Sequence, residues 1–153
     1  MDNKEIIYDI KRAWEGGATL SALALALTIP DICNPGKRKG EYIKWYEEYV
    51  IKYLKQDEKM VLSGEEVYAF RCAFLHEMNT QIDEQQVMEK RTRNHFFCVS
   101  NKRVGITIRD ADLSEDYIRV CIPILIEQLM AGYNKFLRCN ENFHFHIECV
   151  DFK

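Results

Sequence analysis

The sequence of 153 residues lacks the features that mark several common classes of protein. It contains three prolines and seven glycines, too few for a long flexible linker. Its most apolar stretch, residues 18–29, is shorter than the roughly 20 residues that a membrane-spanning helix needs. P-loop, G-x-G-x-x-G and G-x-S-x-G motifs are missing, which argues against nucleotide hydrolysis, dinucleotide chemistry and serine hydrolysis. The length predicts a single domain, residues 1–153. The short apolar stretch predicts that this domain does not enter a membrane.

The six cysteines lack a disulfide or zinc pattern. None of them forms a C-x-x-C pair, and most stand singly in apolar segments, as Cys72 and Cys121 do. A free cysteine behaves as a small buried hydrophobic residue. Because scattered cysteines fit a reducing compartment better than a disulfide framework, we expect a cytoplasmic protein.

An excess of positive charge is missing too, because the formal net charge is −3. A protein that coats nucleic acid without sequence preference would usually be basic. Short basic clusters occur at 37–39, 90–93 and 102–103, and surface charge of this kind is usually solvated loop. An enzyme that cleaves nucleic acid needs only a local patch, so the composition leaves that class open.

Apolar periodicity predicts a mainly α-helical domain. Helical spacing of apolar residues marks three segments in the first third of the chain: 4–14, 18–27 and 41–54. Ile29-Pro30 predicts the end of the second helix, because the residue before a proline avoids helical geometry. Turn residues then predict a loop over 30–40.

Capping signals predict two later helices. Ser63 and Glu66 have the spacing of a capping box and predict a helix over 64–77. Ser114 offers a second N-cap, for a helix that reaches Leu137 and kinks at Pro123. The helical core would then comprise about 4–77 and 114–138.

The C-terminal half also contains segments typical of strands. Two short runs of strand-forming residues around Ser100–Arg103 predict a hairpin over about 95–108. Residues 143–150 alternate apolar and polar side chains, the pattern of a half-buried strand. We expect these segments to form a small antiparallel β element beside the helices.

Arg71 stands inside the apolar arc of the helix predicted at 64–77. An arginine is always charged, and burying it costs several kcal/mol unless it is paired. Its head group therefore reaches water or has a partner. That partner is either a structural carboxylate, such as Glu41, Glu47 or Glu48, or an anionic group of a ligand.

His76 follows five residues later, near the end of the same helix. At about 100° per residue it lies roughly 140° around the helix from Arg71. We therefore expect the two side chains to meet only if the last turn bends or a second subunit contributes. Histidine at this place is either a cation that complements the helix dipole or a general acid or base.

The segment from Leu62 to Glu77 resembles the HEPN domains, small helical bundles with an arginine and a histidine a few residues apart on a late helix. Arg71 and His76 match the two motif positions, with four residues between them. The resemblance implies a metal-independent endoribonuclease without a cofactor. It also implies a homodimer that brings two motifs together, RNA as substrate, and a toxin–antitoxin or defence setting with an antitoxin protein as partner.

In the reaction that this resemblance implies, the 2′-hydroxyl of RNA attacks the adjacent phosphorus. His76 would take the hydroxyl proton or protonate the leaving oxygen, and Arg71 would hold the phosphate. Family members often have Asn, Asp or His directly after the arginine, where this chain has Cys72. Some HEPN-like domains only bind. The alternative is thus a non-catalytic nucleotide- or RNA-binding or dimerisation module.

A third interpretation uses the predicted C-terminal strand. His144 and His146 would share one face of that strand, and Glu148 would continue the row. Imidazole and carboxylate groups suit a transition metal, so a metal-binding protein remains an alternative. The other interpretation of the row is the solvent face of an edge strand.

Overall fold

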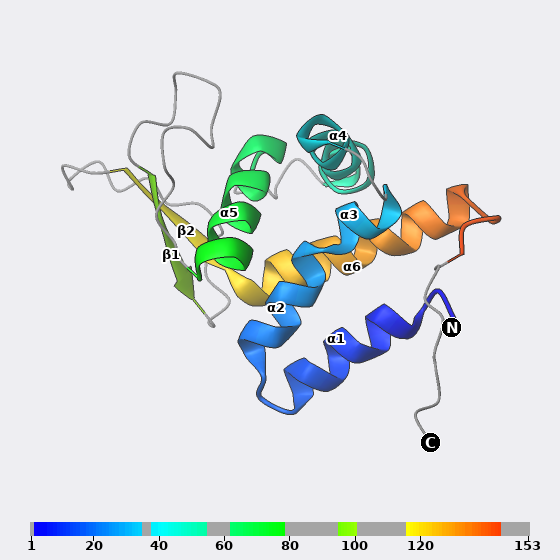
Figure 1. Ribbon diagram of the computed structural model, residues 1–153, viewed down its shortest axis with the longest axis horizontal. Helices are drawn as coiled ribbons and strands as arrows, with labels where there is room; N and C mark the ends of the chain where they lie inside the picture. Colours follow the sequence, from blue (N-terminus) through cyan, green and yellow to red (C-terminus); the bar gives the residue numbers. More distant parts are fainter. Residues whose placement is uncertain (1, 35–37, 55–61, 79–94, 101–115, 145–153) are drawn as a thin grey trace.

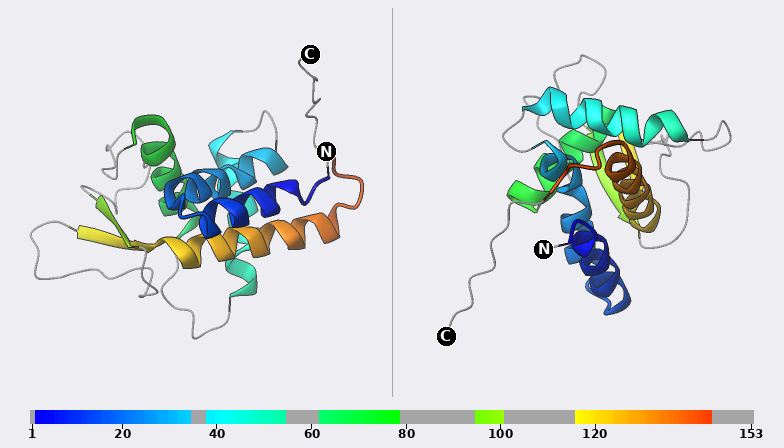
Figure 2. Two further views of the ribbon diagram at one scale, coloured as in Figure 1. Left: turned by 90° about the horizontal axis from the view of Figure 1, so that it is seen from below. Right: turned by 90° about the vertical axis from the view of Figure 1, so that its right-hand side faces the viewer.

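The computed structural model describes the chain over residues 2–34, 38–54, 62–78, 95–100 and 116–144. This part is mainly α-helical, as predicted. Its helices are α1 (Glu5–Glu15), α2 (Thr19–Leu27), α3 (Ile29–Cys33), α4 (Lys39–Tyr49), the 3-10 turn η1 (Ile51–Tyr53), α5 (Gly64–Glu77) and α6 (Ile122–Cys139). The long helix α6 is the centre of the bundle, and α2, α3 and α4 pack against it (Figures 1 and 2). None of these helices is long and apolar enough to cross a membrane.

The first two helices form where the apolar spacing predicts them. α1 buries Ile6, Ile7 and Ile10 on one face. Gly17, with a φ of 80°, lies in the turn to α2, a backbone conformation that residues with a side chain rarely adopt. α2 is apolar on most of its circumference and is accordingly packed between α1, α5 and α6.

Pro30 lies in the first turn of a helix and not in a loop. α2 ends at Leu27 as expected, but α3 follows at once and has Pro30 in its first turn. A proline is tolerated there because its missing N–H would have no intrahelical partner. The loop predicted over 30–40 is therefore wrong up to Cys33 and again at Lys39 and Gly40, which begin α4, and residues 35–37 lie outside the described part of the chain.

α5 begins where its capping signal predicts and ends at the predicted Glu77. The backbone N–H of Glu66 donates to Ser63 Oγ at 3.1 Å, and the N–H of Ser63 donates to Glu66 Oε2 at 2.9 Å. These bonds satisfy helix-end donors that have no intrahelical acceptor. At the other end, Met78 adopts the left-handed conformation with a φ of 49°, and the helix stops.

The strands differ from the prediction. β1 (His95–Ser100) is the first strand of the expected hairpin, but it pairs in parallel with β2 (Asp116–Cys121) and not in an antiparallel hairpin. The hairpin's predicted second strand lies beyond the described residues, and so do residues 145–150 of the predicted C-terminal strand. Phe143 and His144, which begin that segment, have no strand structure.

The helix predicted from Ser114 begins later, at Ile122. The segment 116–121 contains aromatic and β-branched residues and forms β2 instead. Pro123 lies in the first turn of α6 and produces no kink. Ser114 itself lies outside the described residues.

Candidate functional site

Arg71 lies on α5 and reaches across to α3. Its Nε and Nη2 atoms both donate to Oδ2 of Asp31, at 3.0 and 2.8 Å. The Arg71 side chain is 19% exposed and that of Asp31 is 38% exposed, so the ion pair lies at the edge of the core. The expected carboxylate partner exists, but it is not one of the α4 glutamates. Because α3 was predicted as loop, the sequence offered no reason to place Asp31 opposite Arg71.

His76 contacts the same guanidinium from the other side. Nη1 of Arg71 lies 3.0 Å from Nε2 of His76, within one protomer and one regular helix. The expectation that a bent turn or a second subunit is needed for this contact is therefore wrong. The physical reason is the length of the arginine side chain, which spans the angular separation that the helix imposes.

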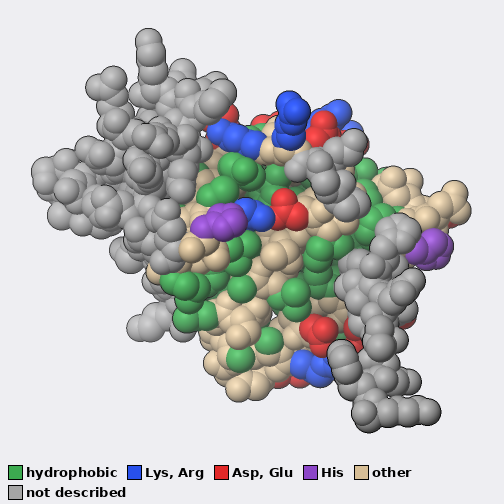
Figure 3. All heavy atoms as spheres, viewed as in Figure 1, with side chains coloured by type: hydrophobic (Ala, Val, Ile, Leu, Met, Phe, Trp, Pro, Cys, Tyr) green, Lys and Arg blue, Asp and Glu red, His purple; other side chains and the backbone are tan. Residues whose placement is uncertain are grey.

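The three polar groups are accessible from solvent. His76 is exposed, and Arg71 and Asp31 are partly exposed. Figure 3 shows a histidine, a basic and an acidic side chain in a row on this face, with hydrophobic side chains around them. A dissolved ligand could therefore reach the imidazole and the outer edge of the guanidinium.

The ion pair keeps Arg71 firmly charged. Burial by itself lowers the pKa of Arg71, but the charge and hydrogen bonds of Asp31 outweigh this effect, so the pKa is raised overall. A permanent cation at this place can hold an anionic group, and it cannot act as an acid near neutral pH.

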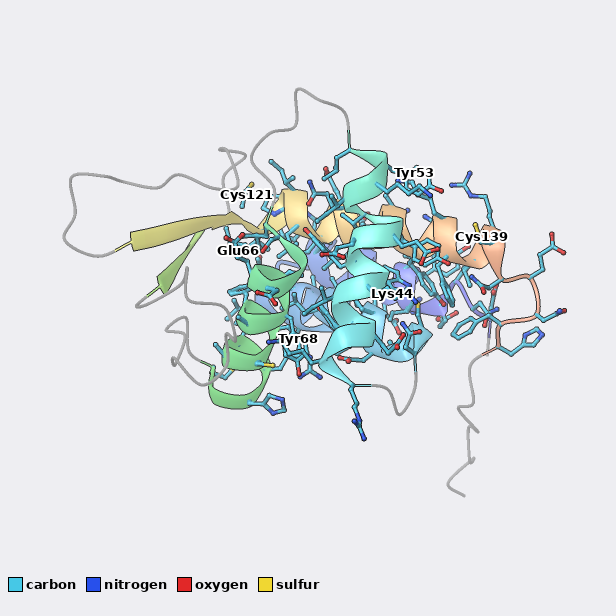
Figure 4. The ribbon with its side chains drawn as sticks, turned by 90° about the horizontal axis from the view of Figure 1, so that it is seen from above. Lys44, Tyr53, Glu66, Tyr68, Cys121 and Cys139 are labelled. Atoms are coloured by element: carbon cyan, nitrogen blue, oxygen red, sulfur yellow. The ribbon has the colours of Figure 1, made fainter. Side chains whose placement is uncertain are left out.

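Tyr68 and Cys72 adjoin Arg71 on α5. Figure 4 shows Tyr68 on the side of α5 that faces α4. Its ring meets the ring of Tyr42 edge-on with centroids 5.3 Å apart, and Nζ of Lys39 lies 5.7 Å from its centroid. Burial, helped by a hydrogen bond with Cys72, raises the pKa of Tyr68. The sequence alone does not distinguish Tyr68 from a core residue, because it has the spacing of one on α5.

Tyr42, which packs against Tyr68, is a buried residue of α4. Its hydroxyl donates to the carbonyl oxygen of Leu27 at 2.9 Å, and the ring is 2% exposed. Leu27 ends α2, so the bond satisfies a carbonyl that the helix leaves without a partner. The bond ties α4 to the junction of α2 and α3, where Asp31 follows four residues later.

The metal interpretation gains no support from the described part of the chain. His144 is exposed, and His146 and Glu148 lie outside the described residues. Within the residues that the structure describes, no group of three or more histidine, cysteine, aspartate or glutamate side chains could hold a metal ion.

A groove lies away from this group. A groove of about 260 Å³ runs between α1 and α6, with Trp14 and Met130 among its lining residues. Neither Arg71 nor His76 contributes to it. Its charged lining residues, Lys11, Glu15 and Glu127, lie on α1 and α6, so the groove is separate from the Arg71–His76 group.

Comparison with protein-family models, with curated proteins and with solved structures found no match.

Proposed function

We propose that this chain is a metal-independent endoribonuclease of the HEPN type, with a HEPN-like helical bundle and Arg71 and His76 as its catalytic residues. The observation that supports the proposal most is the 3.0 Å contact between Arg71 Nη1 and His76 Nε2 at a solvent-accessible place. A fixed cation beside a titratable imidazole is what cleavage of a phosphodiester without a metal requires.

The hydrogen bond selects one form of the imidazole. Guanidinium only donates, so Nε2 of His76 must accept, and the ring is then neutral with its proton on Nδ1. A neutral imidazole is the form that can remove a proton from a hydroxyl. When a phosphate takes the arginine's N–H groups, the lone pair of Nε2 becomes available for that transfer.

In the proposed reaction His76 accepts the proton of the RNA 2′-hydroxyl. The 2′-oxygen forms a bond to the adjacent phosphorus, and the bond from phosphorus to the 5′-oxygen breaks. His76 of the partner subunit, which takes a proton from solvent once its own Arg71 has turned to the phosphate, gives that proton to the leaving 5′-oxygen. The products are a 2′,3′-cyclic phosphate and a 5′-hydroxyl, and Arg71 stabilises the negative charge that grows on the phosphoryl oxygens.

The test uses the purified full chain, RNA oligonucleotides and EDTA. We expect cleavage that EDTA does not reduce, with 2′,3′-cyclic phosphate ends, and no cleavage of the all-2′-deoxy oligonucleotide. His76→Ala and Arg71→Ala should each lower the rate by about 10²-fold or more. The matched controls are His144→Ala and Arg12→Ala, because His144 is exposed and Arg12 pairs with carboxylates on α1. Equal rates in all five proteins would contradict the assigned roles.

The dimer is a separate part of the proposal. A homodimer would bring two histidines to one phosphate, so that one acts as base and the other as acid. Light scattering should give twice the mass of the chain, and mixing His76→Ala with wild type should lower activity more than dilution does. A strictly monomeric chain with full activity would contradict this part.

A toxin–antitoxin setting further predicts that wild type slows growth of an expressing cell and His76→Ala does not.

A non-catalytic module is the second candidate, and one contact favours it. Asp31 already occupies the Nε and Nη2 donors of Arg71, which leaves fewer N–H groups for a phosphate. In this case RNA or nucleotide binds without cleavage over hours, and Arg71→Ala weakens binding while His76→Ala leaves it unchanged.

A further inference from the structure

We infer that Asp31 is a positioning residue: it holds Arg71 in the orientation that faces His76, and so it would set the rate of cleavage without touching RNA. The inference rests on the proposed function for its kinetic part only. Its structural part, an aspartate on α3 that orders an arginine–histidine contact on α5, stands on the hydrogen bonds alone.

The guanidinium presents two edges, and Asp31 takes one of them. Nε and Nη2 converge on the single oxygen Oδ2, at 3.0 and 2.8 Å. Nη1, on the opposite edge, is then aimed at Nε2 of His76 at 3.0 Å. An arginine side chain has several free torsions, and two bonds to one acceptor fix the plane of its head group. Loss of Asp31 would leave Arg71 free to turn away from His76.

Asp31 is suited to this role because its backbone is anchored. The neighbouring Pro30 is buried, and Ile29 and Cys33 belong to the hydrophobic core. The side chain of Asn34 donates to the carbonyl oxygen of Pro30 at 3.1 Å and ends α3. The carboxylate therefore extends from a fixed support toward Arg71, whereas an acidic residue on a loose loop would follow the arginine.

The opposite role would be competition, in which Asp31 occupies the place of the substrate phosphate. The two roles predict opposite kinetics. A positioning residue lowers kcat when it is removed and leaves KM nearly unchanged, because the misplaced group acts in the transition state. A competitor lowers KM when it is removed, because its loss frees the cation for RNA.

The kinetic experiment compares Asp31→Ala, Asp31→Asn and Asp9→Ala. We expect Asp31→Ala to lower kcat by about 10-fold to 10²-fold with KM within roughly threefold of wild type. Asp31→Asn should recover most of the rate, because one amide oxygen can accept both N–H groups as Oδ2 does. Asp9→Ala is the matched control, since Asp9 pairs with Arg12 on α1. The double variant that combines Asp31→Ala with Arg71→Ala should cleave no more slowly than Arg71→Ala alone, because Asp31 acts only through Arg71.

A second measurement does not depend on cleavage. In ¹⁵N NMR spectra of the wild type, we expect Nε2 of His76 to be unprotonated and the Nε–H of Arg71 to be protected from exchange. Asp31→Ala should lose both signatures, and Asp31→Asn should keep them. Thermal unfolding of each variant confirms that the chain is folded, and if Asp31→Ala does not fold, Asp31→Asn compared with Asp31→Leu replaces it.

The two failures are distinguishable. If wild type does not cleave RNA but the NMR signatures depend on Asp31, the proposed function fails and the positioning role stands. If wild type cleaves RNA and Asp31→Ala keeps wild-type kcat, lowers KM, or leaves both NMR signatures intact, the positioning role is overturned while the nuclease stands.

Discussion

Arg71 and His76 are in contact within a single helix, with Nη1 of one 3.0 Å from Nε2 of the other. The backbone of α5 remains regular to Glu77, so the contact results from the extended arginine side chain. The same guanidinium is held on its other edge by Asp31 of α3. One cation thus joins an exposed imidazole to a carboxylate that lies 40 residues away in the sequence.

Arg71→Lys should be nearly as damaging as loss of the side chain. A single ammonium lacks the planar fork that lets Arg71 bridge Asp31 and His76 at once. If the chain cleaves RNA as proposed, we expect the rate of cleavage to fall by about 10²-fold. The measurement is the initial rate in EDTA, beside Arg12→Lys, an exposed arginine that pairs with Glu5 and Asp9. An Arg71→Lys variant that cleaves at the wild-type rate would show that charge alone suffices.

Gly132→Ala should destabilise the contact between α4 and α6. A Cβ at residue 132 would lie 2.8 Å from Cγ2 of Val50 and 3.1 Å from Cη2 of Trp45. Overpacking of this kind costs about 1–3 kcal/mol in the free energy of unfolding. The matched substitution is Gly40→Ala in α4, where the added Cβ meets nothing within 4 Å and stability should stay the same or rise. Urea unfolding measures both, and equal midpoints would refute the packing argument.

Two buried tyrosines should respond differently to loss of the hydroxyl. Tyr42→Phe removes the 2.9 Å bond to Leu27 and leaves a buried carbonyl without a partner, at a cost of about 1–2 kcal/mol. The hydroxyl of Tyr46 is buried and has no hydrogen-bond partner in the structure as described. Tyr46→Phe should therefore be neutral or stabilising. Thermal unfolding distinguishes them, and a larger loss for Tyr46→Phe would be the contrary result.

Stability should fall at alkaline pH. Burial raises the pKa of Tyr42, Tyr46 and Tyr133 above that of tyrosine in an unfolded chain, which is about 10. Below that pH the native and the unfolded states both keep these protons, so the buried neutral hydroxyls make their full contribution to the free energy of unfolding. Above it the unfolded chain loses protons that the native state retains, and stability is lost as pH rises toward the raised pKa values.

Urea unfolding between about pH 8 and pH 11 tests this dependence. Each retained proton contributes a slope of about 1.4 kcal/mol per pH unit in the window above the unfolded pKa. Tyr46→Phe should reduce the slope by one such contribution. A free energy of unfolding that does not change over this range would contradict the assignment of these buried hydroxyls.

Local signals predicted the helix that carries the site. The capping box of Ser63 and Glu66 acts within four residues, and α5 begins where it indicates. The apolar spacing of α1 and α2 is local in the same way. Arg71 could be recognised as a cation that needs a partner, because burial of its neighbours follows from helical periodicity.

Only the tertiary structure identified that partner and the contact with His76. Asp31 reaches Arg71 through the packing of α2, α3 and α5, and no local pattern relates residues 40 positions apart. The parallel pairing of β1 with β2 and the start of α6 at Ile122 likewise depend on non-local contacts, because a short apolar segment suits a strand and a buried helix equally well. Short-range hydrogen bonds and periodicity are encoded residue by residue, whereas the fit between distant side chains exists only once the core has formed.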